Sequence, residues 1–121
     1  METLSLIEVI LFAKDMNKMV KFYRDVLDLP LTNPGKTDFS NEDRVTFETG
    51  NCLLALQSGG KGNIGMDAPK IIFQVMDIKS ARFQLLEQGA AASDIRAPAS
   101  GIQICDARDP EGNAFSIEER S

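Results

Sequence analysis

The stretch "DPEGNAFSIEE", residues 109–119, decides how the C-terminal part of the chain is expected to fold. Its first five residues are typical of a tight turn, because Gly-Asn suits the positive backbone angles of a hairpin. Apolar and polar side chains then alternate, which is the period of a half-buried strand. We therefore expect a strand over residues 113–118. Its two faces are Phe115 and Ile117, turned toward the helices, and Ala114, Ser116 and Glu118 on the opposite side.

Length and composition indicate one folded domain. The chain has 121 residues, 43% of them hydrophobic and 26% charged, which is ordinary for a globular protein and too apolar for disorder. No apolar run approaches the roughly 18 residues of a membrane span, and residues 4–13 do not resemble a signal peptide. We interpret residues 4–13 as a buried strand, and we expect a cytoplasmic protein that does not bind membranes.

Charge and residue types restrict the partners and the cofactors. The net charge of −5 argues against nucleic acid, since phosphate binding depends on clustered Lys and Arg. The chain has no His, and Cys52 and Cys105 lie far apart without the spacing of a zinc site. A basic or neutral small molecule therefore fits the composition better than a polyanion or a structural metal.

The two halves of the sequence repeat each other at an offset of 62 residues. The run "EVILFAKD" at 8–15 matches "KIIFQVMD" at 70–77, and the Gly-Asn pair at 50–51 matches the pair at 112–113. Self-similarity at a fixed offset indicates two copies of one structural module.

Each copy begins with a strand and a helix. The apolar strand stops at an Asp, Asp15 or Asp77, which can cap the helix that follows. Apolar residues at 3.6-residue spacing then predict the two helices. The first stripe is Met16, Met19, Val20, Tyr23 and Leu27, and the second is Ile78, Ala81, Leu85 and Leu86.

Strands complete each copy. Two clear candidates are residues 44–48 and 52–57 in the first copy and 102–107 and 113–118 in the second; a weaker one precedes each pair, near 29–32 and near 92–96. Each module therefore reads βαβββ, which predicts an α+β fold. Module 1 covers about residues 1–58 and module 2 about residues 70–121, with a linker over 59–69.

The linker contains G-x-G-x-x-G at Gly60, Gly62 and Gly65. A dinucleotide-binding fingerprint needs a helix that opens on its last glycine, whereas Pro69 and a strand pattern follow here. We interpret the segment as a linker only.

Over essentially the whole chain these motifs resemble the vicinal oxygen chelate superfamily, also called the glyoxalase/bleomycin-resistance/dioxygenase superfamily. The resemblance rests on "LFAKDMNKMVKFYRDVLDLPL" at 11–31 and on "DPEGNAFSIEE" at the far end. It implies paired βαβββ modules whose sheets curl into a cup, and a homodimer that sometimes exchanges modules. In the enzymes of the family the cup holds a divalent metal, which chelates two neighbouring oxygens of the substrate.

The residues at the metal positions implied by the resemblance are poor ligands. These positions fall on Glu8, Lys70, Ser116 and a fourth residue near Leu54, where Gln57 is the only polar group close by. The ammonium of Lys70 has no lone pair to donate, and Ser116 is a weak ligand. Glu8 alone supplies too little negative charge for a divalent ion. We therefore expect no metal and no other cofactor.

The expected cup is lined by apolar side chains with a few polar groups. Its members are Leu6, Ile10, Phe12, Ile72 and Gln74, together with Glu8, Lys70 and Ser116. Such a cavity suits a small molecule; alternatively, the apolar members simply fill the core. Lys70 would lie beside Glu8 in place of the metal, with Ser116 donating to the pair, unless the strand ends splay apart and both charges reach solvent. The polar stretch 31–44 is expected to be a mobile surface loop or a cover for the cup.

Three classes of function fit these observations. The first is a metal-free dimeric protein that binds a small molecule and resembles the antibiotic-sequestering members of the superfamily. The second is a divergent glyoxalase- or dioxygenase-like metalloenzyme with atypical ligands, or an enzyme with acid–base chemistry through Glu8 and Lys70. The third is an accessory domain without a ligand. We favour the first class, a binding protein and not an enzyme.

Overall fold

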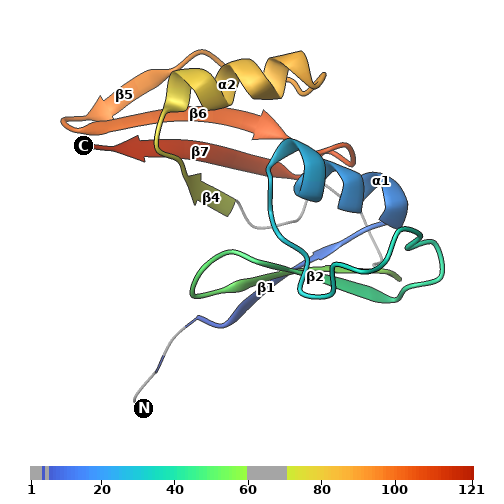
Figure 1. Ribbon diagram of the computed structural model, residues 1–121. Helices are drawn as coiled ribbons and strands as arrows, with labels where there is room; N and C mark the ends of the chain where they lie inside the picture. The colour runs from blue at the N-terminus through green and yellow to red at the C-terminus, as the bar shows by residue number, and fades with distance from the viewer. Residues whose placement is uncertain (1–3, 5, 60–70) are drawn as a thin grey trace. The chain divides into compact units, whose positions relative to one another are not determined.

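The computed structural model describes residue 4, residues 6–59 and residues 71–121. The chain divides into two compact units, Met1–Lys61 and Gly62–Ser121. The first contains β1 (Glu8–Phe12), α1 (Met16–Lys21), the π-helical turn η1 (Phe22–Val26), β2 (Arg44–Glu48) and β3 (Leu53–Gln57). The second contains β4 (Ile71–Gln74), α2 (Ile78–Glu87), β5 (Arg96–Ala99), β6 (Ile102–Arg108) and β7 (Ala114–Arg120) (Figure 1). None of the described helices is long and apolar enough to cross a membrane.

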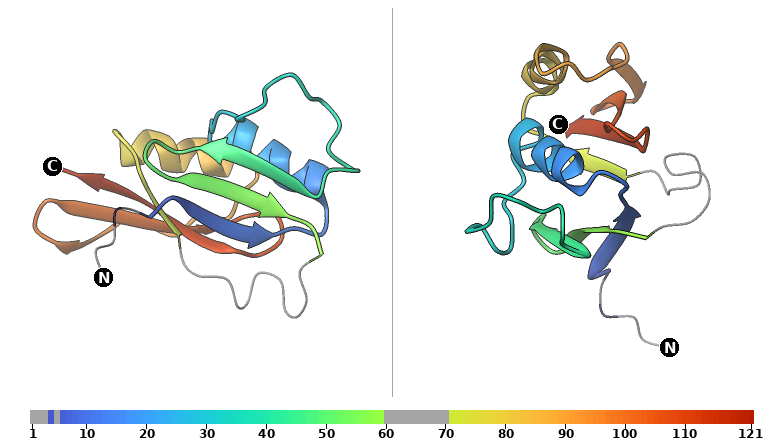
Figure 2. Two further views of the ribbon diagram at one scale, coloured as in Figure 1. Left: turned by 90° about the horizontal axis from the view of Figure 1, so that it is seen from below. Right: turned by 90° about the vertical axis from the view of Figure 1, so that its right-hand side faces the viewer.

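Both units use the same strand arrangement (Figure 2). The orders are β1-β3-β2 and β4-β7-β6-β5. In each unit the last strand pairs parallel with the first strand and antiparallel with the strand before it. The α+β class predicted from the sequence is confirmed, with one sheet in each of the two units. The curling of the two sheets into a cup remains a prediction. Residues 60–69 of the predicted linker lie outside the described residues.

The weak second strand of each module forms differently from the prediction. In the first unit, the predicted strand at 29–32 is reduced to a single bridge between Leu31 and Phe47. In the second unit, the predicted strand at 92–96 contributes a bridge from Ala92 to Ala107, and β5 itself begins only at Arg96. Pro30 interrupts the first stretch, since it has no N–H for a strand ladder, and residues 92–96 lack apolar alternation, so these bounds were the least predictable.

The caps predicted for both helices are present. Asp15 Oδ1 accepts the N–H of Lys18 at 3.1 Å, and Asp77 Oδ1 accepts the N–H of Ser80 at 3.2 Å. Glu119 of β7 adds a bond, because its Oε1 accepts the N–H of Ile78 at 2.8 Å. Each cap satisfies a backbone donor that the first turn of a helix leaves free.

The π-helical turn η1 explains where the predicted helix stripe was wrong. The N–H of Leu27 donates to the carbonyl of Phe22, five residues back, at 3.2 Å. This wider turn buries Phe22 and Tyr23 side by side, with ring centroids 5.3 Å apart and edge to face. Regular 3.6-residue spacing includes Tyr23 but omits Phe22, and it includes Leu27, which is only half-buried.

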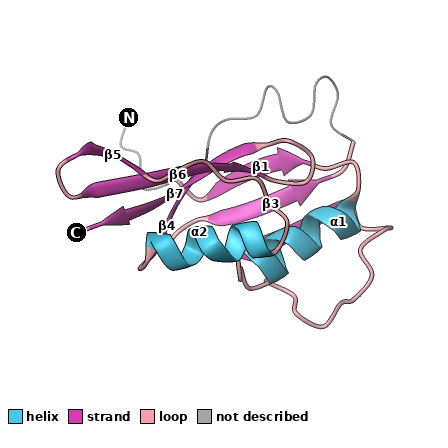
Figure 3. Ribbon diagram, turned by 90° about the horizontal axis from the view of Figure 1, so that it is seen from above, coloured by secondary structure: helices cyan, strands magenta, loops and turns pink. Residues whose placement is uncertain are grey.

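In each unit one face of the sheet packs on its own helix (Figure 3). Tyr23 lies 6.1 Å from Phe47 of β2, ring to ring, which assigns the helix-facing side of the first sheet. The buried strand residues on that side are Leu11, Val45, Phe47, Leu54 and Leu56. In the second sheet the corresponding residues are Cys105, Ala107, Phe115 and Ile117. Glu119, on the same side of β7, accepts the N–H of Ile78 at the start of α2, which supports the predicted orientation of Phe115 and Ile117 toward the helix.

The turn at 109–113 fixes the register of β6 against β7. Asp109 is buried, and its Oδ1 accepts the N–H groups of Glu111 and Asn113 at 2.9 Å each. Its Oδ2 accepts Nδ2 of Asn113 at 2.7 Å. Gly112 has a φ of 87°, which residues with a Cβ rarely adopt. The turn sets the number of residues between the strands, and therefore which side chains of β7 reach each face.

Replacing Asp109 should show how much this turn stabilises the fold. Asp109→Ala leaves two backbone N–H groups and the Asn113 amide without their acceptor, and Asn113 is buried. We expect a loss of about 2 kcal/mol in the free energy of unfolding, measured with urea. The control Asp94→Ala removes an exposed carboxylate of the same unit and should cost less than about 0.5 kcal/mol. Equal losses for both variants would contradict this role of Asp109.

Candidate ligand-binding site

Each sheet has a face turned away from its own helix, which we call its distal face. Strand alternation and pairing register assign its members. On the first sheet they are Glu8, Ile10, Phe12, Arg44, Thr46, Glu48, Leu53, Ala55 and Gln57. On the second sheet they include Ile72, Gln74, Ile104, Asp106, Arg108, Ala114, Ser116 and Glu118. Six of the predicted site residues lie on these faces: Glu8, Ile10, Phe12, Ile72, Gln74 and Ser116.

Large apolar side chains are exposed on the first distal face. Ile10 is 40% exposed, Phe12 45% and Leu53 36%. Leu6, just before β1, is 69% exposed. On the second sheet, Ile72 is 52% exposed at the position that matches Ile10. Exposed apolar groups that gather on one surface mark a place where a ligand or another protein surface can bind.

An ion pair crosses the first distal face. Glu8 Oε1, which is shielded from solvent, pairs with Arg44 Nη2. Arg44 Nη1 also donates to Gln57 Oε1 at 3.3 Å. The carboxylate is therefore neutralised within the first unit, by a strand that lies two positions away in the sheet.

Lys70 was expected to be the partner of Glu8, but it lies outside the described residues. The partner that the structure records for Glu8 is Arg44. The expectation that Ser116 donates to a Glu8–Lys70 pair is wrong, because its hydroxyl donates to Asp106 Oδ1 at 2.5 Å. The reason is the register of β6 and β7, which places Asp106 directly opposite Ser116.

A second polar cluster lies on the distal face of the second sheet. Ser116 is fully buried, and Asp106, which accepts its hydroxyl, also accepts Arg96 Nη1 on Oδ2 at 2.7 Å. The hydrogen bond to Asp106 raises the pKa of Arg96 above its usual value. Asp106 and Arg108 also border an open surface hollow of about 520 Å³, together with residues 91–93 and residues from both sides of β6 and β7.

Glu118 is the other carboxylate on this face. It is buried, and its Oε2 accepts Nε of Arg120 at 2.6 Å. It lies opposite Gln74 of β4 and Ile104 of β6. The ion pairs described for distal carboxylates all involve an arginine: Glu8 with Arg44, Asp106 with Arg96, and Glu118 with Arg120.

The pairing register corrects the position predicted for the fourth family ligand. Ile10 of β1 lies opposite Ala55, and the matching Ile72 of β4 lies opposite Ser116. The residue equivalent to Ser116 is therefore Ala55 and not Leu54. Leu54 is buried on the helix-facing side. The first strands match at the full repeat offset, from Ile10 to Ile72, whereas the last strands match at an offset one residue shorter, from Ala55 to Ser116. The sequence match alone did not show this difference.

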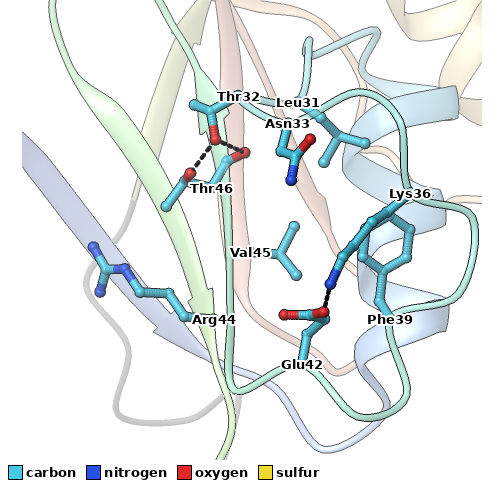
Figure 4. A pocket seen from close by; sticks show the side chains of 9 residues that line it. All are labelled: Leu31, Thr32, Asn33, Lys36, Phe39, Glu42, Arg44, Val45 and Thr46. Carbon is cyan, nitrogen blue, oxygen red and sulfur yellow. Dashed lines mark hydrogen bonds and ion pairs between the residues drawn. The ribbon is translucent and has the colours of Figure 1, made fainter.

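A smaller pocket of about 90 Å³ lies between β2 and residues 31–42 (Figure 4). The stretch expected to be a mobile surface loop is anchored here, because Phe39 is buried and its N–H donates to Asn17 Oδ1 at 2.7 Å. Lys36 pairs with Glu42 at the rim. Arg44 also lines this pocket, and its guanidinium extends toward Glu8 of β1. The pocket has room for a few water molecules, so we do not assign the ligand to it.

Arg44 and Asp106 are site residues that the sequence analysis missed. Both lie inside predicted strands. Alternation in "RVTFE" (44–48) places Arg44 on the face opposite to that of the core residue Val45. The same alternation in "CDA" (105–107) turns Asp106 away from the core. Parity was therefore available as a signal, whereas the ion pairs depend on register between strands that only the structure provides.

Comparison with known proteins identifies the family. The sequence profile described as a glyoxalase-like domain matches residues 8–118. The chain belongs to the glyoxalase-like domain family. No curated protein matches the chain significantly in sequence.

Solved structures share the fold of this glyoxalase-like protein. An antibiotic-binding protein from Streptomyces superposes with a TM-score of 0.79 at 14% identity, covering 100% of this chain and 99% of that one. A glyoxalase family protein from Bacillus anthracis gives 0.78 at 16% identity, covering 99% and 98%. A lactoylglutathione lyase from Agrobacterium tumefaciens gives 0.73 at 20% identity, covering 95% and 92%. At these identities the likeness extends to the fold alone.

The residues of this chain do not fit the divalent metal of the family's enzymes. At the family's ligand positions stand Glu8, already neutralised by Arg44, and Ser116, whose hydroxyl is bound to Asp106. Ala55 has no donor atom at all. In the part of the chain that the structure describes, no three His, Cys, Asp or Glu residues gather in a way that could hold a metal ion.

A double-mutant cycle tests the Glu8–Arg44 pair. Arg44→Met leaves the shielded Glu8 oxygen without a partner, so it should destabilise the protein more than the double variant Glu8→Gln with Arg44→Met. Because the Arg44 side chain is 40% exposed, we expect a difference of about 1 kcal/mol in urea unfolding.

The matched control for this cycle is the exposed pair Arg24–Asp25 on η1. The variants Arg24→Met and Asp25→Asn should show a coupling close to zero. Purely additive effects at Glu8 and Arg44 would show that the pair does not act as a unit.

Proposed function

We propose that this protein binds a small organic molecule without the help of a metal, and that it does so as a homodimer. In this respect it would resemble the antibiotic-sequestering, bleomycin-resistance-like members of its superfamily. The proposed ligand contacts on the distal face of the first sheet are Glu8, Ile10 and Phe12. On the second sheet they are Ile72 and Gln74. Lys70 and Ser116 are also kept as proposed ligand-binding residues.

The observation that carries this proposal is the composition of the first distal face. Ile10, Phe12 and Leu53 present apolar surface around the neutralised Glu8–Arg44 pair. Apolar surface with a few oriented polar groups is typical of sites that bind organic ligands. A face used only to pack the unit would be expected to bury these side chains fully.

The fold is compatible with this function. One of the similar structures is an antibiotic-binding protein, and it matches the whole of this chain with a TM-score of 0.79. Its identity of 14% transfers no residue role, so the proposal rests on the distal faces of this chain.

The metalloenzyme alternative has less support. A similar fold occurs in a lactoylglutathione lyase. A divergent enzyme of this kind would need ligands at the family positions, where this chain has Glu8 bound to Arg44, together with Ala55 and Ser116. Acid–base chemistry through Glu8 would require its release from Arg44.

The size of the units supports the proposed homodimer. A module of about 60 residues can hardly bury both faces of its sheet, and Ile10, Phe12 and Ile72 are all at least 40% exposed in the single chain. A second copy could cover such surface and complete the ligand site. Sedimentation that gave a monomer at micromolar concentration would contradict this arrangement.

Metal analysis and assays distinguish the two functions. We expect purified protein to carry no stoichiometric transition metal by mass spectrometry. We also expect no glyoxalase turnover when zinc, nickel or manganese is added, with a metal-dependent lactoylglutathione lyase as the positive control. A thermal-shift screen of small molecules should find compounds that raise the melting temperature, because a ligand that binds only the folded state stabilises it. One equivalent of bound metal, or turnover restored by metal, would overturn the proposal.

A further inference from the structure

The guanidinium of Arg44 is held at two of its edges. Nη2 pairs with Glu8 of β1, and Nη1 donates to Gln57 of β3 at 3.3 Å. Hydrogen bonds to a guanidinium lie in its plane. These two contacts, one from β1 and one from β3, hold the guanidinium against the distal face of the first sheet.

The register shows what lies beneath this group. Arg44 is opposite Gln57, whereas Glu8 is opposite Leu53, at the other end of β3. We call residues that lie opposite one another on neighbouring strands a row. To reach Glu8, the side chain of Arg44 would run diagonally across the row formed by Ile10, Ala55 and Thr46. Ala55 is fully buried, as expected if the Arg44 side chain lies over its methyl group. A larger residue at this position would push Arg44 off the sheet.

Part of the Arg44 side chain remains open to solvent. Arg44 keeps 40% of its side chain exposed, although its two recorded partners occupy its edges. Phe12 lies in the same row as Gln57 and Arg44, and Ile10 lies in the next row; both are partly exposed. The result is a cationic plane set among apolar side chains.

We propose that Arg44 determines the specificity of the ligand site, and that its guanidinium selects a flat aromatic ligand by stacking on it. This inference rests on the proposed small-molecule function and names the ligand class. Guanidinium planes stack on aromatic rings through cation–π attraction and dispersion. An anionic ligand is disfavoured at this point, because it would have to displace the Glu8 carboxylate or lie beside it.

A matched pair of uncharged probes tests the inference. The compounds 2-naphthol and decahydro-2-naphthol share one carbon skeleton and one hydroxyl group, and only the first is aromatic and flat. We expect the protein to bind 2-naphthol more tightly by calorimetry. Arg44→Lys keeps the charge near Glu8 but removes the plane, so the affinity for 2-naphthol should fall about 5-fold. The affinity for decahydro-2-naphthol should not change.

Two further measurements exclude a merely structural effect. Arg24→Lys changes an exposed arginine on η1 that also pairs with a carboxylate, and it should leave both affinities unchanged. In unmutated protein, 2-naphthol should move the Nε–H resonance of Arg44 upfield through its ring current, and decahydro-2-naphthol should not.

The outcomes separate this inference from the proposed function. If both probes bind and Arg44→Lys weakens them equally or not at all, the stacking role is overturned while small-molecule binding stands. An Arg44 Nε–H resonance unmoved by bound 2-naphthol would overturn it as well. If neither probe binds the unmutated protein, both the stacking role and the proposed apolar ligand site are contradicted.

Discussion

The pairing of the last strand in each unit is the constraint on which the rest of the structure depends. β3 and β7 each lie between the first strand, which runs parallel, and the preceding strand, which runs antiparallel. Because side chains alternate along a strand, a shift of one residue would exchange every core residue with a distal one. In the second unit the buried Asp109 carboxylate holds the turn that prevents such a shift. The same pairing brings Glu119 to the start of α2, so the position of the helix also depends on the register of β7.

The two sheets share one pairing pattern, but different residues occupy the matching positions of their distal faces. The middle row of the first sheet is Ile10, Ala55 and Thr46, and the middle row of the second is Ile72, Ser116 and Asp106. Ala55 leaves room for Arg44 to cross the sheet to Glu8, whereas the hydroxyl of Ser116 is bound to Asp106. The acids that could have served a metal are neutralised by arginines. The rest of the first distal face combines the exposed apolar Ile10, Phe12 and Leu53 with the polar Thr46, Glu48 and Gln57.

The sequence predicted the module order, the Asp caps and the direction of Phe115 and Ile117, because these depend on local periodicity and turn chemistry. It missed Phe22, since a π-helical turn breaks the 3.6-residue period. It placed the fourth family position at Leu54 because an ungapped repeat cannot reveal that the spacing between paired strands differs by one residue. The partners of Glu8 and Ser116 were also beyond its reach. Each contact joins residues on different strands, and it depends on a register that no single segment encodes.

The isoleucine methyl spectrum of the protein tests the ligand-binding role of the distal faces most directly. The methyl groups of Ile10 and Ile72 lie on these faces, whereas Ile78 and Ile117 are buried in the helix-facing core of the second unit. With any compound that raises the melting temperature, the account predicts that the resonances of Ile10 and Ile72 move during the titration and that those of Ile78 and Ile117 stay in place. Shifts confined to Ile78 and Ile117, with Ile10 and Ile72 unchanged, would contradict it.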